Sequence, residues 1–494
     1  MDYLIGLDVG TTATKALLFT PDGRIAASAT EPYKLITGSS GEVEQDPEAM
    51  WQAVVAALKK LSKSLRNGDH ILAISQSSQG GTTIPVSEKM EPIGNAISWM
   101  DQRSHEEKAL IDEHFGAEKL RMLTGWPLIN GLPLQHIVWM RNKRADLFAR
   151  TRFFLFVNDF IGYRLTGDLF MDPSNASITQ LFNVEKKDWE ETILEFAGIS
   201  QSQLSPVSES GIVVGSLTDE AARLTGLPSK TPVVNGAHDQ YCSAVGLGVT
   251  EPGLVQLACG TAWVLLAVPE SLEIGLASGM AISCHAASNR WGGLHSLGGI
   301  GVCMEWALDH LWENEKNTIG RQKALALMDE GIAAESPPGA NGVLYLPVAG
   351  GHGEGYGLSP GGFFEMSVHS SRYDMARAVM ETVAFELRSA LEDFAKRGMR
   401  VKLMKATGGG ANSRIWQQIV ADVTQIPVEM PVSSQSASWG AAVLAAMGVG
   451  AEPTTGKTGM DGEERMLEPI HSDLYDDVYL KYRNLRELTA RNKI

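Results

Sequence analysis

The sequence predicts an α/β protein with two similar domains. Its 494 residues are too many for one hydrophobic core, so two large domains are the natural count. A pattern of apolar strand, Gly-Thr turn and apolar strand occurs twice, at residues 5–19 and 255–268. The second copy repeats the Leu, Gly and Thr of the first at a constant offset. The duplication indicates that the two halves share one architecture.

The first half begins with a predicted β-meander over residues 3–35. Asp46 and Pro47 then suit the N-cap and the first position of a helix, and the apolar residues that follow have helical spacing. A strand is expected at about 71–77. The order of hairpin, strand, helix and strand is typical of an α/β protein. An α-rich, aromatic-rich region at about 104–200 is expected to be an insertion that closes over a ligand.

The second half repeats this order, with strands expected near 279–284 and 292–297 after the hairpin. A long helix is predicted from Asp374 to about 397, because Gly398 is a suitable helix terminator. We assign residues 1–248 to an N-terminal domain and 249–450 to a C-terminal domain. Residues 451–494 form a predicted tail with a final helix near 472–491.

The composition excludes several classes of partner. There are 42 lysines and arginines against 58 aspartates and glutamates, a formal net charge of −16, which disfavours nucleic acids and anionic membranes. The first residues lack the basic start of a secretory signal, and the longest apolar helical run, near 439–451, is too short to span a bilayer. The four cysteines have neither redox nor zinc-site spacing. We expect a cytoplasmic protein with free thiols.

The two Gly-Thr turns are candidate phosphate-binding loops. Glycine allows a ligand to approach the backbone, and the N–H groups and threonine hydroxyls that follow can donate to an anion. The first turn contains Gly10, Thr11 and Thr12, and the second contains Gly260 and Thr261. Only the first copy carries a carboxylate, Asp8, so that copy is the candidate for holding Mg²⁺ beside phosphate.

Two further segments combine a strand, a glycine-containing turn and a helix. Residues 408–413 place three glycines and Asn412 before a predicted helix, which suits a flat or anionic ligand. Residues 236–240 place Asp239 at the end of a strand, where a carboxylate can act as general base toward a substrate hydroxyl. Asp239 can also be the N-cap of the helix that follows, and the two roles can coexist. For His238 we expect a structural hydrogen-bonding role.

Taken in order, these motifs resemble those of the FGGY family of carbohydrate kinases, and the xylulokinases in particular. The resemblance covers residues 3 to about 448 and includes a W-x-D-x-R segment at Trp99, Asp101 and Arg103. It implies two actin-like, ribonuclease-H-like domains flanking a nucleotide and sugar cleft, with ATP as co-substrate, Mg²⁺ as cofactor and Asp239 as catalytic base. Asp8 would hold Mg²⁺, through water. Homodimers are common in this family, so a homodimer is expected by analogy alone.

The resemblance also assigns binding residues. The nucleotide-binding set is Gly10, Thr11, Thr12, Lys15, Gly260, Thr261, Gly301, Gly409, Gly410 and Asn412. The substrate-binding set is Gln79, Gly80, Gly81, Asp101, Arg103, Asn158 and Asp239.

Three departures from the family pattern concern the acceptor site and a loop. Gly80 and Gly81 stand where xylulokinases carry a Met-His pair and glycerol kinases an Arg-Glu pair, which leaves room either for a larger sugar or for a side chain from elsewhere. His136 replaces the family's usual lysine, and the glycine-rich stretch around Glu354 lacks the arginine that often follows it.

The acceptor therefore stays open at this point. The resemblance favours a ketopentose such as xylulose, with gluconate, another ketose, erythritol or glycerol as alternatives. Two functions from other classes also remain. One is a non-catalytic, actin-like nucleotide- or sugar-binding sensor or assembly module, and the other is an actin-like ATPase without a sugar site.

Overall fold

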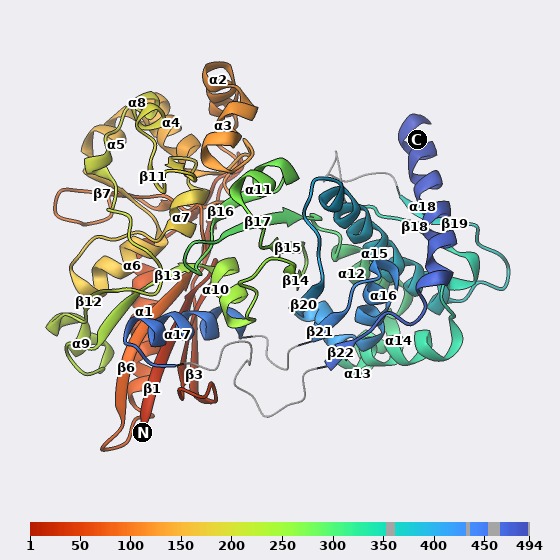
Figure 1. Cartoon of the computed structure of the whole chain (residues 1–494). Helices are drawn as coiled ribbons and strands as arrows, with labels where there is room; N and C mark the ends of the chain where they lie inside the picture. The colour runs from red at the N-terminus through yellow and green to blue at the C-terminus, as the bar shows by residue number, and fades with distance from the viewer. Residues whose placement is uncertain (352–360, 431–434, 453–464, 493–494) are drawn as a thin grey trace. The chain divides into compact units, whose positions relative to one another are not determined.

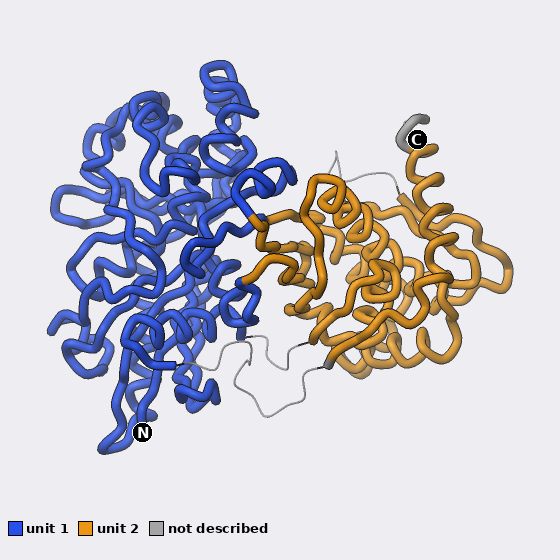
Figure 2. The backbone as a smooth tube through the Cα atoms, in the orientation of Figure 1, with its two compact units in different colours: residues 1–250, 271–293, 435–461 blue, residues 251–270, 294–434, 462–494 orange. Residues whose placement is uncertain are grey.

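The computed structural model describes residues 1–351, 361–430, 435–452 and 465–492 (Figure 1). The chain forms two compact units, coloured separately in Figure 2. The first comprises residues 1–250, 271–293 and 435–461, and the second comprises 251–270, 294–434 and 462–494. Each unit therefore takes segments from distant parts of the chain. The boundary near residue 248 and the three-part division of the chain stay predictions. The loop around Glu354 lies outside the described residues.

The first unit has a central mixed sheet whose strand order is β12-β13-β6-β1-β2-β3. Its strands are β1 (Asp2–Val9), β2 (Ala13–Phe19), β3 (Ile25–Pro32), β6 (His70–Ser78), β12 (Val213–Ser216) and β13 (Pro232–His238). Strands β1, β6 and β13 are parallel, whereas β2, β3 and β12 run antiparallel to their neighbours. The predicted hairpin and the strand predicted at about 71–77 are confirmed.

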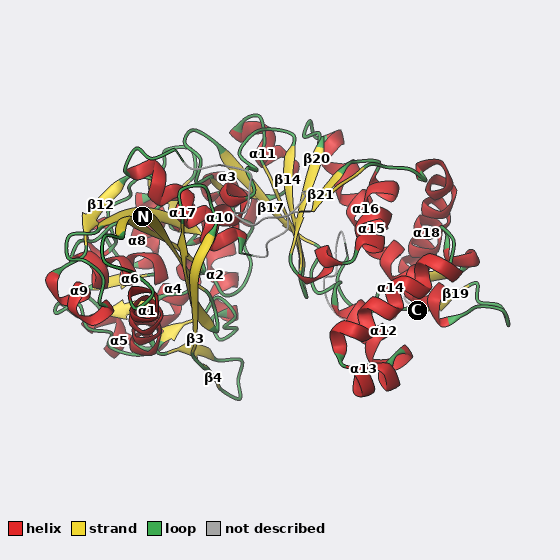
Figure 3. Cartoon of the chain, turned by 90° about the horizontal axis from the view of Figure 1, so that it is seen from below, coloured by secondary structure: helices red, strands yellow, loops and turns green. Residues whose placement is uncertain are grey.

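Smaller strands and helices complete this unit, and Figure 3 shows them by type. The strands are β4 (Leu35–Thr37), β5 (Val43–Gln45), β7 (Ile84–Val86), β8 (Ala96–Ile97), β9 (Phe153–Leu155), β10 (Phe182–Asn183), β11 (Asp188–Trp189) and β16 (Ala281–Cys284). The helices are α1 (Pro47–Ser62), α2 (His105–Phe115), α3 (Ala117–Thr124), α4 (Pro133–Lys143), α5 (Ala145–Arg150), α6 (Val157–Thr166), α7 (Pro173–Ile178), α8 (Glu191–Ala197), α9 (Asp219–Thr225), α10 (Asp239–Gly246), α11 (Leu272–Ser278) and α17 (Ser436–Gly448). Residues 104–200 are thus mainly helical, as predicted.

Strand β1 is covered on both faces because successive side chains point to opposite sides of a sheet. Ile5, Leu7 and Val9 join the apolar core under α1, whose start is capped as predicted. The other face of β1 receives α17 so closely that a Cβ added to Gly6 would lie 1.8 Å from the carbonyl oxygen of Ser438. Helix α17 also packs on α10 and β6, which explains why a late segment of the chain belongs to the first unit.

The second unit repeats the hairpin and its parallel neighbour. Strand β14 (Leu254–Cys259) pairs antiparallel with β15 (Trp263–Ala267) and parallel with β20 (Leu403–Thr407), which is followed by β21 (Val428–Met430) and β22 (Arg465–Leu467). Its other elements are α12 (Val302–Leu311), α13 (Glu313–Ile319), α14 (Arg321–Glu335), β18 (Leu344–Leu346), β19 (Gly362–Phe364), α15 (Arg372–Lys396), α16 (Arg414–Thr424) and α18 (Ser472–Asn492). Strand β17 (Trp291–Ser296) runs across the division between the units.

The long helix α15 begins two residues before its predicted start. Ser371 is the N-cap, and Asp374 occupies the third helical position. The Ser371 hydroxyl accepts from the backbone N–H of Asp374 at 3.2 Å, while the Asp374 carboxylate accepts from the backbone N–H of Ser371 at 2.8 Å. This reciprocal capping box places the acidic residue inside the first turn. Across the described ranges, no helix combines the length and the apolar character that a membrane crossing requires.

Candidate functional site

In the first unit, the carboxyl ends of three parallel strands bring together residues that are far apart in sequence. Asp8 lies near the end of β1, Gln79 directly follows β6, and Asp239 directly follows β13. In the sheet register, Asp8 is opposite Ser77 on one side and opposite Lys15 on the other. Because parallel strands end at one edge of a sheet, the predicted cation ligand, acceptor loop and base share that edge.

Asp8 is a buried carboxyl group with a perturbed pKa. The pKa of Asp8 is raised to about 6, chiefly by burial and next by the nearby charge of Asp239, whereas the Ser77 hydroxyl and Lys15 act in the opposite direction. The Ser77 hydroxyl donates to Asp8 Oδ1 at 2.9 Å. Two carboxylates that repel each other at a strand edge favour the approach of a cation or a proton.

The first phosphate-loop candidate is tied back to the fold through its carbonyl groups. The backbone N–H of Gly10 donates to the carbonyl of Ala13 at 3.1 Å, and the Gln45 amide donates to the carbonyl of Thr11 at 2.7 Å. The Trp99 indole donates to the Thr11 hydroxyl at 3.2 Å. One bond therefore closes the turn within the hairpin, two hold Thr11 from outside it, and Thr12 at the tip is exposed.

The acceptor loop at residues 79–81 is closely packed. Gln79 donates to Gln45 at 3.0 Å, which links this loop to the first Gly-Thr turn. A Cβ added to Gly80 would lie 2.7 Å from Cδ2 of His238, and one added to Gly81 would lie 3.1 Å from Cβ of Trp99. The space beside Gly80 is thus filled by the side chain of His238. Of the two alternatives for this position, a larger sugar or a side chain from elsewhere in the chain, the structure has the second.

Asp101 and Arg103 form an ion pair whose Nη2–Oδ2 distance is 2.8 Å. Arg103 also pairs with Glu44 at 2.7 Å, and Asp101 accepts from the backbone N–H of Val43 at 2.7 Å. Asp101 is fully buried, so these groups join β5 to the segment after β8.

Asn158 is fully buried, and both its carbonyl and its side-chain oxygen accept from the Gln76 amide, at 2.6 and 2.8 Å. The hydrogen bonds and ion pairs of Asp101, Arg103 and Asn158 described above are all made with other residues of the chain. Their assignment to substrate binding stays a prediction.

Asp239 is the first residue of α10, and His238 rather than Asp239 is the N-cap. The alternative of an Asp239 N-cap is therefore wrong. The Asp239 side chain is 34% exposed and the His238 side chain 8%, with 3.2 Å between His238 Nε2 and Asp239 Oδ1. An accessible carboxylate held by a buried imidazole is a suitable proton acceptor.

His136, the residue that departs from the family's lysine, is fully buried on α4. Its Nδ1 lies 3.0 Å from the Thr83 hydroxyl. Burial lowers the pKa of His136 to about 3, and the charge of Arg103 acts in the same direction. The imidazole is therefore neutral and does not supply the positive charge that a lysine would.

The second unit contains a cavity of about 650 Å³. All six predicted nucleotide-binding residues of this unit line its wall: Gly260, Thr261, Gly301, Gly409, Gly410 and Asn412. Pockets of this size accept drug-sized ligands. The other four predicted nucleotide-binding residues, Gly10, Thr11, Thr12 and Lys15, belong to the first unit.

The wall of this cavity is built by close backbone contacts. The backbone N–H of Gly301 donates to the carbonyl of Thr261 at 3.1 Å, and a Cβ on Gly301 would lie 2.3 Å from the carbonyl oxygen of Gly260. Gly408 has a φ of +89° and packs on Cys259, whereas Gly409 has no atom within 4 Å of its Cβ direction. Gly409 thus faces open space, as a residue beside a bound group should.

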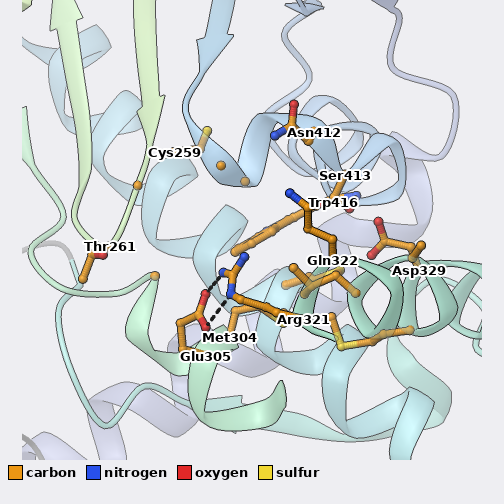
Figure 4. Close-up of a pocket in the computed structure, with 18 of the residues that line it drawn as sticks. Cys259, Thr261, Met304, Glu305, Arg321, Gln322, Asp329, Asn412, Ser413 and Trp416 are labelled. Atoms are coloured by element: carbon orange, nitrogen blue, oxygen red, sulfur yellow. Dashed lines mark hydrogen bonds and ion pairs between the residues drawn. The ribbon is translucent and has the colours of Figure 1, made fainter. Parts of the chain in front are cut away.

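Several residues that line the cavity were not among the nucleotide-binding residues predicted from the sequence. Figure 4 shows Trp416 and Gln322 lying between the ion pair of Glu305 with Arg321 and the carboxylate of Asp329. Burial raises the pKa of Asp329 to about 6, opposed by a hydrogen bond with Ser413. Trp416 follows the glycine turn by a few residues, and this proximity could have indicated from the sequence that it lines the same site. Helix α14 carries Gln322 and Asp329 with no motif around them.

Comparison with known proteins gives consistent matches along the chain. Residues 3–246 match the N-terminal domain of the FGGY family of carbohydrate kinases, and residues 259–449 match its C-terminal domain. The xylulose kinase of Bacillus subtilis (strain 168) is 31% identical over 453 residues, which cover 91% of this chain and 89% of that protein. The gluconokinase of the same organism is 29% identical over 454 residues, which cover 90% and 86%.

The fold is similar to that of a solved kinase. The crystal structure of ligand-bound xylulose kinase from Lactobacillus acidophilus is 24% identical and has a TM-score of 0.88, with 99% of each chain covered. This similarity confirms the predicted α/β fold with two actin-like, ribonuclease-H-like domains. The prediction of a carbohydrate kinase is confirmed by the two domain matches, which together span most of the sequence. The chain belongs to the FGGY family of carbohydrate kinases.

Proposed function

We propose that this carbohydrate kinase transfers the γ-phosphoryl group of ATP to a hydroxyl group of a ketopentose, with xylulose as the first candidate. The relatives include proteins named xylulose kinase and gluconokinase, so gluconate is the second candidate. The observation that carries the proposal is the shared strand edge at which Asp8 and Asp239 interact electrostatically. Homodimer formation stays a prediction from the family resemblance.

Asp239 is the proposed base. Its side chain is partly exposed while its partner His238 is buried, so a substrate hydroxyl can reach the carboxylate. The carboxylate would orient the hydroxyl and take its proton as the oxygen attacks the phosphorus atom. A positioned base contributes about 10²–10⁴-fold to the rate. Phosphoryl transfer otherwise depends mainly on positioning and charge stabilisation.

The residues around Asp8 suit a magnesium ion. Within the described parts of the chain, no group of three or more His, Cys, Asp or Glu side chains could hold a metal by itself. Mg²⁺ commonly needs only one or two carboxylates beside phosphate oxygens and water. Asp8, repelled by Asp239 and bonded to Ser77, would hold the ion through water, and the bound ion would neutralise phosphate charge.

The cavity of the second unit is the proposed site for the nucleoside of ATP. It combines the indole of Trp416 with the polar groups of Asn412, Ser413 and Asp329. A planar apolar surface with a few polar groups is typical of small-molecule sites. The Gly260 and Thr261 turn at its edge would donate to phosphate oxygens.

The test is a coupled assay of ADP release with Mg²⁺·ATP and a panel of ketoses, aldonates and polyols. The expected result is ADP release that depends on one acceptor, highest with xylulose, and that falls at least about 10²-fold in Asp239→Asn while ATP still binds. The matched control is Asp219→Asn, because Asp219 is also the first residue of a helix, α9, but is exposed. A xylulose response no greater than the background without sugar would reject xylulose as the acceptor. ATP binding with no response to any acceptor would favour the sensor alternative.

A further inference from the structure

We propose that His238 is a positioning and specificity-determining residue of the acceptor site, because its imidazole takes the side-chain space beside Gly80 and also holds the carboxylate of Asp239. This inference rests on the proposed function, in which Asp239 is the base. It concerns two residues at the ends of neighbouring strands, β6 and β13, which the sequence separates by more than 150 positions.

The first observation is the absence of free space beside Gly80. A Cβ on Gly80 would lie 2.7 Å from Cδ2 and 3.0 Å from Nε2 of His238, and 3.0 Å from Cγ2 of Ile178. Contacts below 3.0 Å essentially do not occur for real Cβ atoms, so any side chain here would displace the imidazole. Gly80 and His238 therefore depend on each other: the glycine admits the ring, and the ring replaces the missing side chain.

The second observation is that the imidazole cannot easily move aside. The backbone N–H of His238 donates to the Ser174 hydroxyl at 2.9 Å, and this hydroxyl donates to the buried carboxylate of Asp172. The ring of Tyr241 lies 5.8 Å from the imidazole, and the Tyr241 hydroxyl donates to the carbonyl of Gly292 at 2.9 Å. The hydrogen bond thus anchors the His238 backbone, and the ring of Tyr241 packs beside the imidazole.

The third observation is the contact with the base. His238 Nε2 lies 3.2 Å from Asp239 Oδ1, while Nδ1 is buried and finds no hydrogen-bond partner among the described residues. In the proposal, the ring proton is on Nε2, so the imidazole attracts the Asp239 oxygen beside it. This contact involves one carboxylate oxygen, and the other oxygen would receive the substrate hydroxyl. Asp8 and Asp172 interact electrostatically with Asp239 and His238 respectively, and Lys15 with Asp8, so the contact lies among two further carboxylates and one ammonium group.

Two consequences follow for the reaction. The His238 ring limits the space for the acceptor directly beside Asp239. A smaller side chain at position 238 should therefore admit acceptors with an extra substituent near the attacking hydroxyl. Releasing Asp239 should lower kcat more than it changes the KM for ATP, because the nucleotide cavity is formed by other residues. A misplacement of about 1 Å can cost about 10²-fold in rate.

The experiment compares His238→Gln, His238→Leu and His238→Ala by kcat, by KM for ATP and by the ratio of activities across the acceptor panel. Gln fills similar space and can still donate to Asp239, so it should keep kcat within about 10-fold of the wild type. Leu fills the space without a donor and should lose about 10²-fold in kcat at an unchanged acceptor ratio. Ala should lose kcat and also accept bulkier sugars. Equal kcat values and acceptor ratios in all three variants would overturn the proposal.

A second measurement tests the contact without any enzyme assay. Gly80→Ala should lower the thermal unfolding midpoint in the wild-type background and lower it clearly less in the His238→Ala background, where only the contact with Ile178 at 3.0 Å remains. Gly94→Ala is the matched control, because its nearest neighbour lies at 3.9 Å. Equal effects of Gly80→Ala in both backgrounds would disprove the contact.

A different result would reject the proposed function itself: no Asp239-dependent ADP release by the wild type with any acceptor. An active wild type whose His238 variants behave like it contradicts only this inference.

Discussion

The contact between α10 and α17 allows a sharp prediction, because α10 begins with the proposed base. A Cβ on Gly440 would lie 1.7 Å from the carbonyl oxygen of Cys242 and 2.5 Å from its carbonyl carbon. The contact is reciprocal, since a Cβ on Gly246 would lie 2.3 Å from the carbonyl oxygen of Ser436. Both obstacles are backbone atoms, which cannot rotate away. Gly440→Ala must therefore separate the two helices.

The required displacement sets the size of the effect. Real Cβ contacts are essentially never shorter than 3.0 Å, so the helices must move apart by at least roughly 1.3 Å at this point. Overpacking costs about 1–3 kcal/mol, and the better helix propensity of alanine returns at most about 1 kcal/mol. Because backbone atoms cannot rotate out of the contact, the upper end of this range applies, and we expect a net loss of about 2 kcal/mol in the free energy of unfolding. Since Asp239 moves with α10, we also expect a loss of about 10²-fold in kcat.

Urea unfolding and the ADP-release assay check both numbers. Gly94→Ala is again the control, because it adds the same methyl group in the first unit without a close neighbour. A Gly440→Ala protein with wild-type stability and turnover would refute the reasoning that the α10–α17 contact positions the base. A loss of stability with full turnover would show that Asp239 is held independently of the α10–α17 contact.

Three further predictions concern charge and the nucleotide loop. His136 stays neutral in the folded chain, because burial lowers its pKa to about 3, whereas the unfolded chain binds a proton below pH 6.5. The contribution of neutral His136 to the free energy of unfolding is complete above pH 6.5 and is lost as the pH falls toward 3. Between pH 6.5 and 5, urea titrations should show that the free energy of unfolding falls by about 2 kcal/mol more in the wild type than in His136→Phe. Because burial raises the pKa of Asp8 to about 6, kcat/KM should fall as the pH drops below 6. A higher Mg²⁺ concentration should shift this fall in the pH–rate profile to lower pH. A profile that does not change with Mg²⁺ concentration would contradict the metal role of Asp8. Gly301→Ala should displace the Gly260 turn and raise the KM for ATP about 10-fold with the acceptor KM unchanged, as measured by initial rates.

The elements with local signals were predictable from the sequence. Both Gly-Thr hairpins, the capped start of α1 and the strand–turn–helix around Gly409 occur as expected, because turn residues, caps and apolar spacing act over a few residues. Asp8 and Asp239 were identified for the same reason, each at the end of an apolar strand. The start of α15 was wrong by two residues, since an acidic residue suits both the cap and the first turn.

The sequence alone therefore determined the class of fold and the family, and it predicted the residues of the candidate site. Tertiary structure decided which residues share a wall: six residues from three distant segments meet around the cavity of the second unit, and Asp329 joins them from a helix without any motif. It also decided that the gap at Gly80 is filled by His238 and that His136 is a neutral, buried group. These facts depend on packing between segments far apart in the chain, and packing depends on three-dimensional contacts that no local pattern encodes.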